Sequence, residues 1–128
     1  MPLLYLKMKE SEIQEQVIKV LDGTLPNGSL RHHSPNEGLH KPHYRAKQAR
    51  LGMVSGWPDI EIFVPAESFR LGKLPAPIFI ELKSATGRLS DKQRLVLAML
   101  EQLGCYTMVC RSVAEVLEFL KRHVKLKC

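Results

Sequence analysis

The sequence has no long hydrophobic segment, few aromatic residues and few cysteines. No apolar run approaches the roughly 20 residues that a membrane-spanning helix needs, and no signal peptide is recognisable, so we expect a cytoplasmic protein without a membrane partner. The three cysteines, Cys105, Cys110 and Cys128, are odd in number, and two of them lie in an apolar segment typical of a strand. Buried thiols in a reducing compartment explain this pattern better than disulfides or zinc.

Acidic residues are scarce relative to basic ones. The 128 residues include 19 Lys and Arg against 13 Asp and Glu, which gives a formal net charge of +6. The apolar content of 45% is typical of a globular protein, and we expect residues 1–128 to form a single domain with its own hydrophobic core. The positive charge favours an anionic partner. A basic surface without any such partner is the alternative that charge alone leaves open.

Hydrophobic periodicity predicts an alternation of helices and strands. Alternating apolar residues indicate strands over residues 59–64 and 77–83, and residues 105–110 form a third strand-like run. Helical spacing of Ile13, Val17, Val20 and Leu21 predicts a first helix over 9–22. This order is typical of an α/β sandwich with a small mixed sheet flanked by helices.

Two capping boxes mark the starts of the last two helices. Ser90 to Gln93 begins a helix that Gly104 ends, and because this helix is apolar on nearly every face we expect it to be buried. Ser112 to Glu115 begins a helix that ends near residue 123.

The segment 28–56 differs in composition from the rest of the chain. Residues 31–38 are polar and rich in turn-forming types, and a short helix is expected near 43–51. The second half is strongly basic. We interpret the segment as a loop-rich flap over the functional site, within the single domain.

Two short motifs carry acidic residues in positions that suggest chemistry. In Gly56-Trp57-Pro58-Asp59, Pro58 fixes its backbone angle and Gly56 frees its own, so the acid begins a strand from a rigid turn. In Glu81-Leu82-Lys83 the two charged side chains share one strand face within an apolar run, where unpaired charges are costly. A divalent metal and a phosphodiester would supply their partners. The alternatives are an acid that merely starts a strand and an ion pair at the rim of the sheet.

The chain resembles the VRR-NUC nucleases of the PD-(D/E)xK superfamily, in particular their small stand-alone phage and bacterial members. The resemblance covers residues 9–111 in family order, and its most specific part is the Gly-Arg-Leu-Ser-x-x-Gln sequence of residues 87–93 after Glu-x-Lys. The other matching pieces are Glu10 with Ile13-Gln14, residues 33–38, and the two acidic motifs. Trp57 departs from the smaller residues usual at its position, and we expect it to alter the wall of the pocket.

The resemblance implies an αβββαβ core and divalent-metal-dependent cleavage of DNA, with Mg²⁺ or Mn²⁺ held by hard oxygen ligands. Lys83 would orient the attacking water or stabilise the phosphate in the transition state. Two assignments stay open: Glu12 replaces Glu10 if the first helix is rotated, and Gln93 either contacts the site or only caps its own helix. The metal ligands implied are Asp59, Glu81, the backbone carbonyl of Leu82, and Glu10 directly or through water.

DNA contacts are expected mainly from the flap. By the family match, His33, Asn36 and Glu37 form a loop at the edge of the site. Zinc binding by the histidines of the flap is a poor alternative, because no cysteine pair lies nearby and their spacing fits no structural zinc site. Glu61, on the same strand face as Asp59, is expected to be solvated. The predicted cationic phosphate contacts are Lys41, Arg45, Lys47, Arg50 and Arg88.

We therefore expect a structure-selective DNA endonuclease that acts on branched, Holliday-junction-like DNA. One site nicks one strand, so paired incisions call for a homodimer, built either from the first helix and flap or from the last helix. The alternatives are a non-catalytic nucleic-acid-binding module on a nuclease-like scaffold, and a subunit or inhibitor that acts through protein contacts.

Overall fold

A mixed four-stranded sheet forms the centre of the computed structural model, which describes residues 8–34 and 42–127. The strands lie in the order β1 (Leu30–His33), β2 (Ile60–Phe63), β3 (Ile78–Leu82) and β4 (Tyr106–Cys110). β1 and β2 are antiparallel, β2 and β3 are antiparallel, and β4 runs parallel to β3. The predicted mixed sheet is confirmed.

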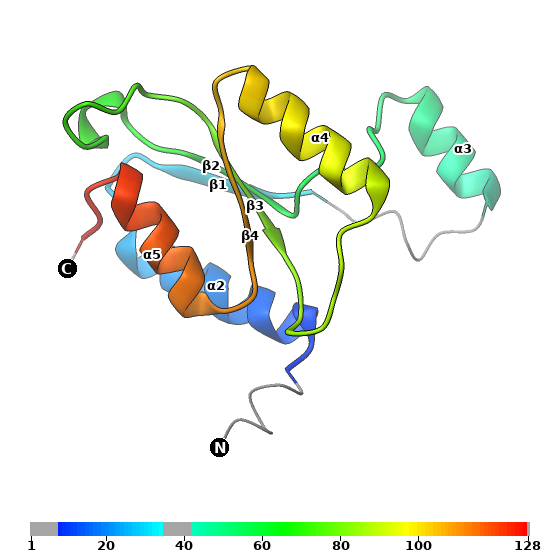
Figure 1. The fold of residues 1–128 in the computed structure, drawn as a ribbon, viewed down its shortest axis with the longest axis horizontal. Helices are drawn as coiled ribbons and strands as arrows, with labels where there is room; N and C mark the ends of the chain where they lie inside the picture. Colours follow the sequence, from blue (N-terminus) through cyan, green and yellow to red (C-terminus); the bar gives the residue numbers. More distant parts are fainter. Residues whose placement is uncertain (1–7, 35–41, 128) are drawn as a thin grey trace.

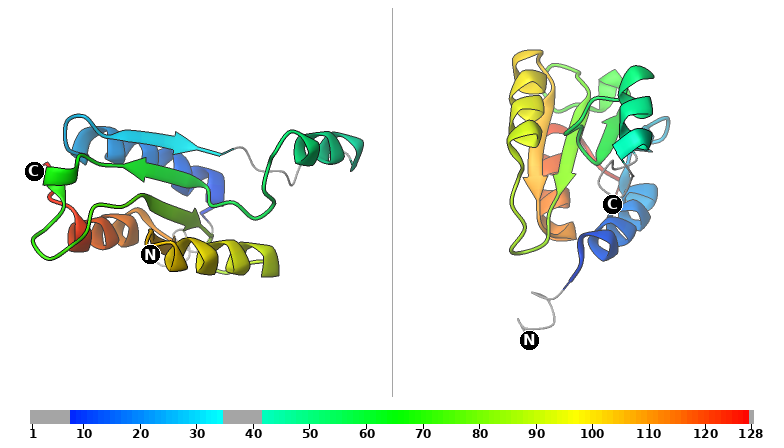
Figure 2. Two further views of the ribbon diagram at one scale, coloured as in Figure 1. Left: turned by 90° about the horizontal axis from the view of Figure 1, so that it is seen from above. Right: turned by 90° about the vertical axis from the view of Figure 1, so that its right-hand side faces the viewer.

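Helices cover both faces of this sheet (Figure 1). α2 (Glu10–Thr24) and α5 (Val113–His123) pack on one face and touch each other, whereas α4 (Asp91–Gln102) packs against β4 from the other face. The views in Figure 2 show α3 (Pro42–Arg50) projecting from the sheet. The chain order is thus the αβββαβ core predicted from the family, with α3 inserted after β1 and α5 added at the end.

The main core lies between the sheet and the α2–α5 layer. Ile60 and Ile62 of β2 and Ile78 and Ile80 of β3 point to this face and are fully buried. Burial of each such side chain contributes about 1.5–3 kcal/mol, so this face fixes the relative positions of the two strands that end at the acidic motifs. The helix residues buried against them are Ile13, Val17, Leu21, Val116, Phe119 and Leu120.

The core on the α4 side is smaller than the sequence predicted. Phe79, Val96 and Leu100 are buried together there, with Trp57 and Cys105 packed at the edge. The expectation that α4 is buried all round is wrong, because Leu95, Met99 and Leu103 are exposed. Periodicity reports that a residue is apolar, and it does not say whether the same chain supplies a layer to cover it.

Residues 31–33 form most of a strand, so their assignment to a turn-rich loop was wrong. β1 pairs with β2 in register from Leu30 opposite Phe63 to His33 opposite Ile60. All four side chains of β1 are exposed, so no alternation of buried and polar residues marks the strand. A bidentate ion pair from Arg31 to Asp22 at the end of α2, with N···O distances of 2.7 and 3.0 Å, attaches β1 to the helix layer.

The remaining elements agree with the predicted ones to within two residues at their ends. α2 continues through Gly23 to Thr24, where the Leu25 N–H bonds the Leu21 carbonyl. No helix in residues 8–34 or 42–127 has the length and apolarity needed to cross a membrane.

The two cysteines within the described part of the chain are free thiols. Cys110 is buried and Cys105 is half-buried. Burial raises the pKa of the Cys110 thiol to about 12, and it also raises the pKa of Cys105. Both thiols are therefore packing groups rather than nucleophiles. Cys128 lies outside the described residues.

Gly56 and Gly72 provide a matched test of how tightly the first acidic motif packs on α4. Both have positive φ, of +85° and +87°, but a Cβ at Gly56 would lie 2.7 Å from the backbone carbon of Lys92, whereas Gly72 has open space around it. We expect Gly72→Ala to lose about 1–2 kcal/mol of unfolding free energy through backbone strain. Gly56→Ala should lose a further 1–3 kcal/mol or so through overpacking. Urea denaturation measures both, and equal losses would contradict this packing.

Candidate active site

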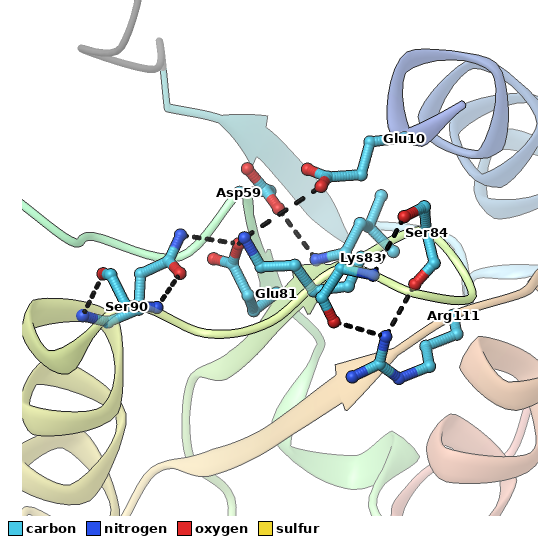
Figure 3. Close-up of polar contacts among 10 residues, drawn as sticks. Glu10, Asp59, Glu81, Lys83, Ser84, Ser90 and Arg111 are labelled. Carbon is cyan, nitrogen blue, oxygen red and sulfur yellow. Dashed lines mark hydrogen bonds and ion pairs between the residues drawn. The ribbon is translucent and has the colours of Figure 1, made fainter.

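Three carboxylates from three elements converge at one end of the sheet (Figure 3). Glu10 begins α2, Asp59 precedes β2 and Glu81 lies near the end of β3. Because β2 and β3 are antiparallel, the start of one lies beside the end of the other. Each acid offers an oxygen, and these three oxygens lie within 4.8 Å of one another. Convergence of Asp59 and Glu81 was expected from the sequence, which left the acid of the first helix open between Glu10 and Glu12.

Asp59 is held through both its side chain and its backbone. Its buried Oδ2 accepts a hydrogen bond from the Leu82 N–H at 2.7 Å. Its carbonyl oxygen accepts the Ser34 N–H at 3.1 Å and is 2.9 Å from His33 Nδ1. The carboxylate is therefore fixed to β3 and the backbone to β1, so its second oxygen points in a defined direction.

Trp57 and Glu61 hold together the turn that carries Asp59. The Trp57 Nε1–H donates to Glu61 Oε2 at 3.0 Å, and Glu61 Oε1 is 2.8 Å from His32 Nδ1 of β1. The indole packs edge-on against Phe79, with ring centroids 5.6 Å apart. The expectation that Glu61 is solvated is wrong, because Trp57, four residues earlier, and His32 of a neighbouring strand contact its two oxygens. The unusual Trp57 thus supports the turn.

Glu81 is the most buried of the three acids, with 1% of the residue exposed. Its Oε2 accepts a hydrogen bond from Gln93 Nε2 at 3.0 Å and lies 3.6 Å from Lys83 Nζ. Burial, and next the charge of the neighbouring Asp59, raise the pKa of the Glu81 carboxyl to about 8, although Lys83 opposes the shift. In the absence of a cation, the site therefore takes up a proton near neutral pH.

Gln93 both caps α4 and contacts the site. Its backbone N–H donates to Ser90 Oγ at 3.1 Å, and its Oε1 accepts the Ser90 N–H at 2.9 Å. With Oε1 used by that donor, the amide nitrogen is the group that reaches Glu81. The two alternatives that the sequence left open for the side-chain contacts of Gln93 are therefore compatible.

Lys83 points into the acidic cluster. Its Nζ lies 3.6 Å from Glu81 Oε2 and 4.0 Å from Glu10 Oε2, and its side chain is almost fully buried. The backbone N–H of Lys83 bonds the Cys110 carbonyl of β4.

Arg111 fixes the loop after Lys83, and sequence reasoning missed it. Its Nη1 donates to the carbonyls of Ser84 and Gly87 at 2.6 and 2.7 Å (Figure 3). Arg111 directly follows β4, and the carboxyl ends of the parallel strands β3 and β4 meet at the same edge. The parallel pairing of these two strands is the signal that could have placed Arg111 beside the loop after Lys83.

The structure distinguishes the two acids of the first helix by position. Glu12 Oε1 accepts the Lys9 N–H at 2.9 Å in the cap of α2, and the residue is exposed. Glu10 instead contributes to the carboxylate cluster.

The predicted DNA-contacting residues lie outside this cluster. Arg45, Lys47 and Arg50 are exposed on α3, and Arg88 is exposed in the loop before α4. Arg45 and Lys92, the latter not predicted, line a cavity of about 340 Å³ between α3 and the start of α4. Asn36, Glu37 and Lys41 lie outside the described residues.

The chemistry of the site fits a divalent cation. Hard oxygen ligands close together are what Mg²⁺-like ions prefer, and the three carboxylates can hold a metal ion. Within residues 8–34 and 42–127, the cationic group that lies within 4.0 Å of Glu10 and Glu81 is the Lys83 ammonium. One ammonium does not neutralise three carboxylates. A metal ion would supply the missing positive charge and would displace the proton from Glu81.

Comparison with known proteins supports the resemblance to the VRR-NUC nucleases. The VRR-NUC domain profile matches residues 8–114. A solved structure described as a VRR_NUC domain protein is similar with a TM-score of 0.71 and 23% sequence identity, over 92% of this chain and 89% of that one. That likeness concerns the fold. No curated protein matches the chain significantly.

The raised pKa of Glu81 predicts how stability depends on pH without metal. Because the folded state keeps the proton up to about pH 8, against 4.5 for an ordinary glutamate, the unfolding free energy should fall by about 1.4 kcal/mol per pH unit inside that window as the pH rises. Glu81→Gln should remove this slope. Urea denaturation in chelator across the window measures it, and a divalent cation should restore stability at high pH only in the wild type. An unchanged slope in Glu81→Gln would contradict the assignment.

Proposed function

The chain belongs to the VRR-NUC family of nuclease domains, and on that basis we propose that it is a divalent-metal-dependent endodeoxyribonuclease acting on branched DNA. The observation that carries the proposal is the convergence of Glu10, Asp59 and Glu81 around Lys83. Residues 1–128 act as one nuclease domain, with the segment 28–56 as its DNA-contacting flap. It works in the cytoplasm of a bacterium or of a phage-infected cell, where its free thiols stay reduced.

Mg²⁺ or Mn²⁺ would be held by Asp59, Glu81, Glu10 and the Leu82 carbonyl. When bound, the metal lowers the pKa of a coordinated water and offsets the negative charge that develops on the phosphate. The fixed hydrogen bonds support this ligand set. The Leu82 N–H donates to Asp59 Oδ2, and the Gln93 amide donates to Glu81 Oε2. In each acid the other oxygen remains for the cation.

Lys83 supplies the positive charge that acts directly on the substrate. Its ammonium is kept near the acids by Glu81 and Glu10, and in a buried site a donor directed at the phosphate oxygens stabilises the transition state more than it does in water. Gln93 orients Glu81 and is therefore a positioning residue for the ligand set.

DNA binds along the basic side of the flap and the start of α4. Arg45 and Lys92 line one cavity, which suits a phosphate of the bound strand. Arg88, in the loop between Lys83 and α4, and Lys41 and Asn36 of the flap add further contacts. His33 directs its protonated Nδ1 at the Asp59 carbonyl, so its Nε2 donates to a phosphate only when the ring carries a second proton.

Branched DNA and a homodimer complete the proposal. In the described part of the chain there is one carboxylate cluster of this kind. One such cluster would cut one DNA strand at a time. Two copies related by a two-fold axis would make the paired incisions that a junction requires.

Replacing Glu81 or Lys83 should strongly slow cleavage. We expect Glu81→Gln and Lys83→Met to lower the rate of nicking of a labelled four-way junction by roughly 10²–10³-fold, because each change removes a charge-stabilising group from the reacting centre. Chelation should remove wild-type activity as well. Cleavage at close to the wild-type rate in the chelator or in Glu81→Gln would refute the proposal, and intact binding without any wild-type turnover would favour the non-catalytic alternative.

Glu10→Gln and Glu12→Gln form a matched pair within the same experiment. Both neutralise one acid in the first turn of α2, and only Glu10 belongs to the cluster. Glu10→Gln alone should weaken metal-dependent cleavage. Equal effects of the two variants would indicate a general effect of helix charge.

Removing the basic residues of α3 should weaken DNA binding with little effect on chemistry. We expect the triple change of Arg45, Lys47 and Arg50 to Ala to raise the dissociation constant for junction DNA. The slope of log K against log salt should fall by about 0.9 for each phosphate that the protein no longer neutralises. The control removes three cations at the end of α5: Lys121, Arg122 and Lys125 to Ala. Fluorescence anisotropy at several salt concentrations measures both, and identical slopes would contradict a specific role for α3.

A further inference from the structure

The last strand of the sheet, β4, has one open edge. Within the described residues β4 pairs with β3 alone. The Tyr106 N–H and the Cys110 carbonyl both form backbone hydrogen bonds on the β3 side. Because the backbone groups of successive strand residues point in alternate directions, the N–H and C=O groups of the intervening Thr107 and Val109 point away from β3, toward the open edge.

The chain itself closes the two ends of this edge and leaves its middle open. Before β4, the Cys105 N–H bonds the Leu100 carbonyl of α4 at 3.0 Å. After β4, the Arg111 N–H bonds Glu115 Oε1 at 2.7 Å. The open backbone groups are therefore those of the two outward-pointing residues in between, which suffice to pair with a short extended segment.

The open edge of β4 lacks the features that usually protect an edge strand. Proteins commonly place charged side chains, proline or a covering element at such an edge. Tyr106–Cys110 contains no charged residue and no proline, whereas the edge strand on the other side of the sheet, β1, carries an arginine and two histidines. An uncharged edge with open backbone groups is a template for pairing with another chain.

A cavity of about 250 Å³ lies beside the first half of β4. It is bounded by α4 and α5, which lie on opposite faces of the sheet (Figure 1). Its wall is aromatic, since the His123 ring stacks on Tyr106 with centroids 4.2 Å apart and meets Phe119 edge-on at 5.1 Å. Cys105 and Met108 add polarisable sulfur to the lining. These groups suit a bulky apolar or aromatic side chain.

Two exposed cations lie near this cavity. Arg122 lines it directly. Lys73 belongs to the β2–β3 connection, which the Tyr106 hydroxyl attaches to the start of β4 by donating to the Leu74 carbonyl at 2.7 Å. Burial lowers the pKa of His123, and the charges of Lys73 and Arg122 lower it further. The cavity therefore lies in a positive potential, which favours an acidic ligand.

The acidic residue that lines the cavity in the described part of the chain is Glu101. Its Oε2 accepts a hydrogen bond from Thr107 Oγ1 at 3.0 Å, so this carboxylate already has a partner. Glu101 belongs to α4, whereas Arg122 belongs to α5. The acidic part of a ligand would thus lie on the α5 side of the edge.

We propose that the open edge of β4 binds an extended segment of another protein, in which a bulky apolar side chain lies next to acidic residues. The segment adds a fifth strand, whose backbone pairs with Thr107 and Val109 and whose bulky side chain enters the cavity. Its acidic residues face Lys73 and Arg122. DNA would satisfy the two cations, but it has no N–H and C=O groups at the spacing of a strand.

The peptide site lies apart from the carboxylate cluster. The cavity is beside the start of β4, whereas Glu81 and Lys83 lie at the end of the neighbouring parallel strand. The acids therefore stay open to substrate when the edge is occupied. A partner bound there would recruit the chain without competing for its DNA.

Fluorescence anisotropy with labelled peptides tests the site. The probes are two octapeptides of one composition, valine and threonine with one tryptophan, and an aspartate pair at either the N-terminal or the C-terminal end. Because the acidic pair must lie at the start of β4, one probe fits a parallel added strand and the other an antiparallel one. We expect one of them to bind the full chain with a dissociation constant below about 1 mM. Binding of neither would overturn the proposal.

Backbone methylation of the better probe supplies a matched control. Alternate N–H groups of a strand face its neighbour, so N-methyl groups on one alternate set should weaken binding by roughly tenfold, and those on the other set should not. In the protein, hydrogen exchange of the Val109 amide should slow when the probe binds. Equal effects of the two sets, or unchanged exchange at Val109, would overturn strand addition.

Charge reversal tests the acidic part of the ligand. Lys73→Glu and Arg122→Glu should each weaken binding of the better probe by roughly tenfold, because a carboxylate would then face the aspartate pair. Lys19→Glu, which reverses an exposed cation of α2, should leave the affinity unchanged. Circular dichroism confirms that each variant is folded. Equal affinities of the three variants would overturn the acidic partner.

Two further measurements address other occupants of the edge. In light scattering, a probe that halves the mass of the protein would show that a second copy occupies the edge, and would overturn the proposal. Displacement of the probe by a short oligonucleotide would overturn it in favour of nucleic acid. Glu81→Gln should bind the probe as tightly as the wild type, so this proposal and the nuclease assignment fail or stand separately.

Discussion

Two carboxylates held side by side in a buried site, Asp59 and Glu81, are the constraint on which the rest of the structure depends. Like charges at this separation repel strongly where water is excluded. The donors that fix them, the Leu82 N–H and the Gln93 amide, are neutral and orient the oxygens without cancelling the charge. The fold therefore keeps an electrostatic deficit that Lys83 only partly offsets, and a bound cation would offset the remainder.

The sheet topology assembles this site from short local motifs. An antiparallel β2–β3 pair brings the turn before β2 to the end of β3, and the parallel β3–β4 pair brings Arg111 beside the loop after Lys83. The capping box of α4 then gives Gln93 a fixed direction. Each motif needs only its own turn chemistry, and the ladder hydrogen bonds of the sheet supply the long-range alignment.

The sequence predicted the parts whose signal is local, and it failed where the partner is distant. Asp59, Glu81 and Lys83 were recognisable because strand alternation and a rigid turn set their directions. β1 was not, since backbone pairing holds its exposed side chains in place and leaves no pattern of burial. Glu61 was misjudged because its partner His32 lies on another strand. The expected burial of α4 failed for a further reason, that apolar periodicity does not show whether the chain supplies a layer to cover each apolar face.

α4 connects the two acidic motifs because it contacts both the turn that carries Asp59 and the side chain of Glu81. Its first turn packs directly on the Asp59 turn, where the space at Gly56 is too small for a Cβ, and its Gln93 holds Glu81. The backbone that faces Gly56 belongs to Lys92 and Gln93, so the residue that packs on the Asp59 turn with its backbone also holds Glu81 with its side-chain amide. The position of the first turn of α4 therefore sets the direction of one acid and the packing of the turn that carries the other.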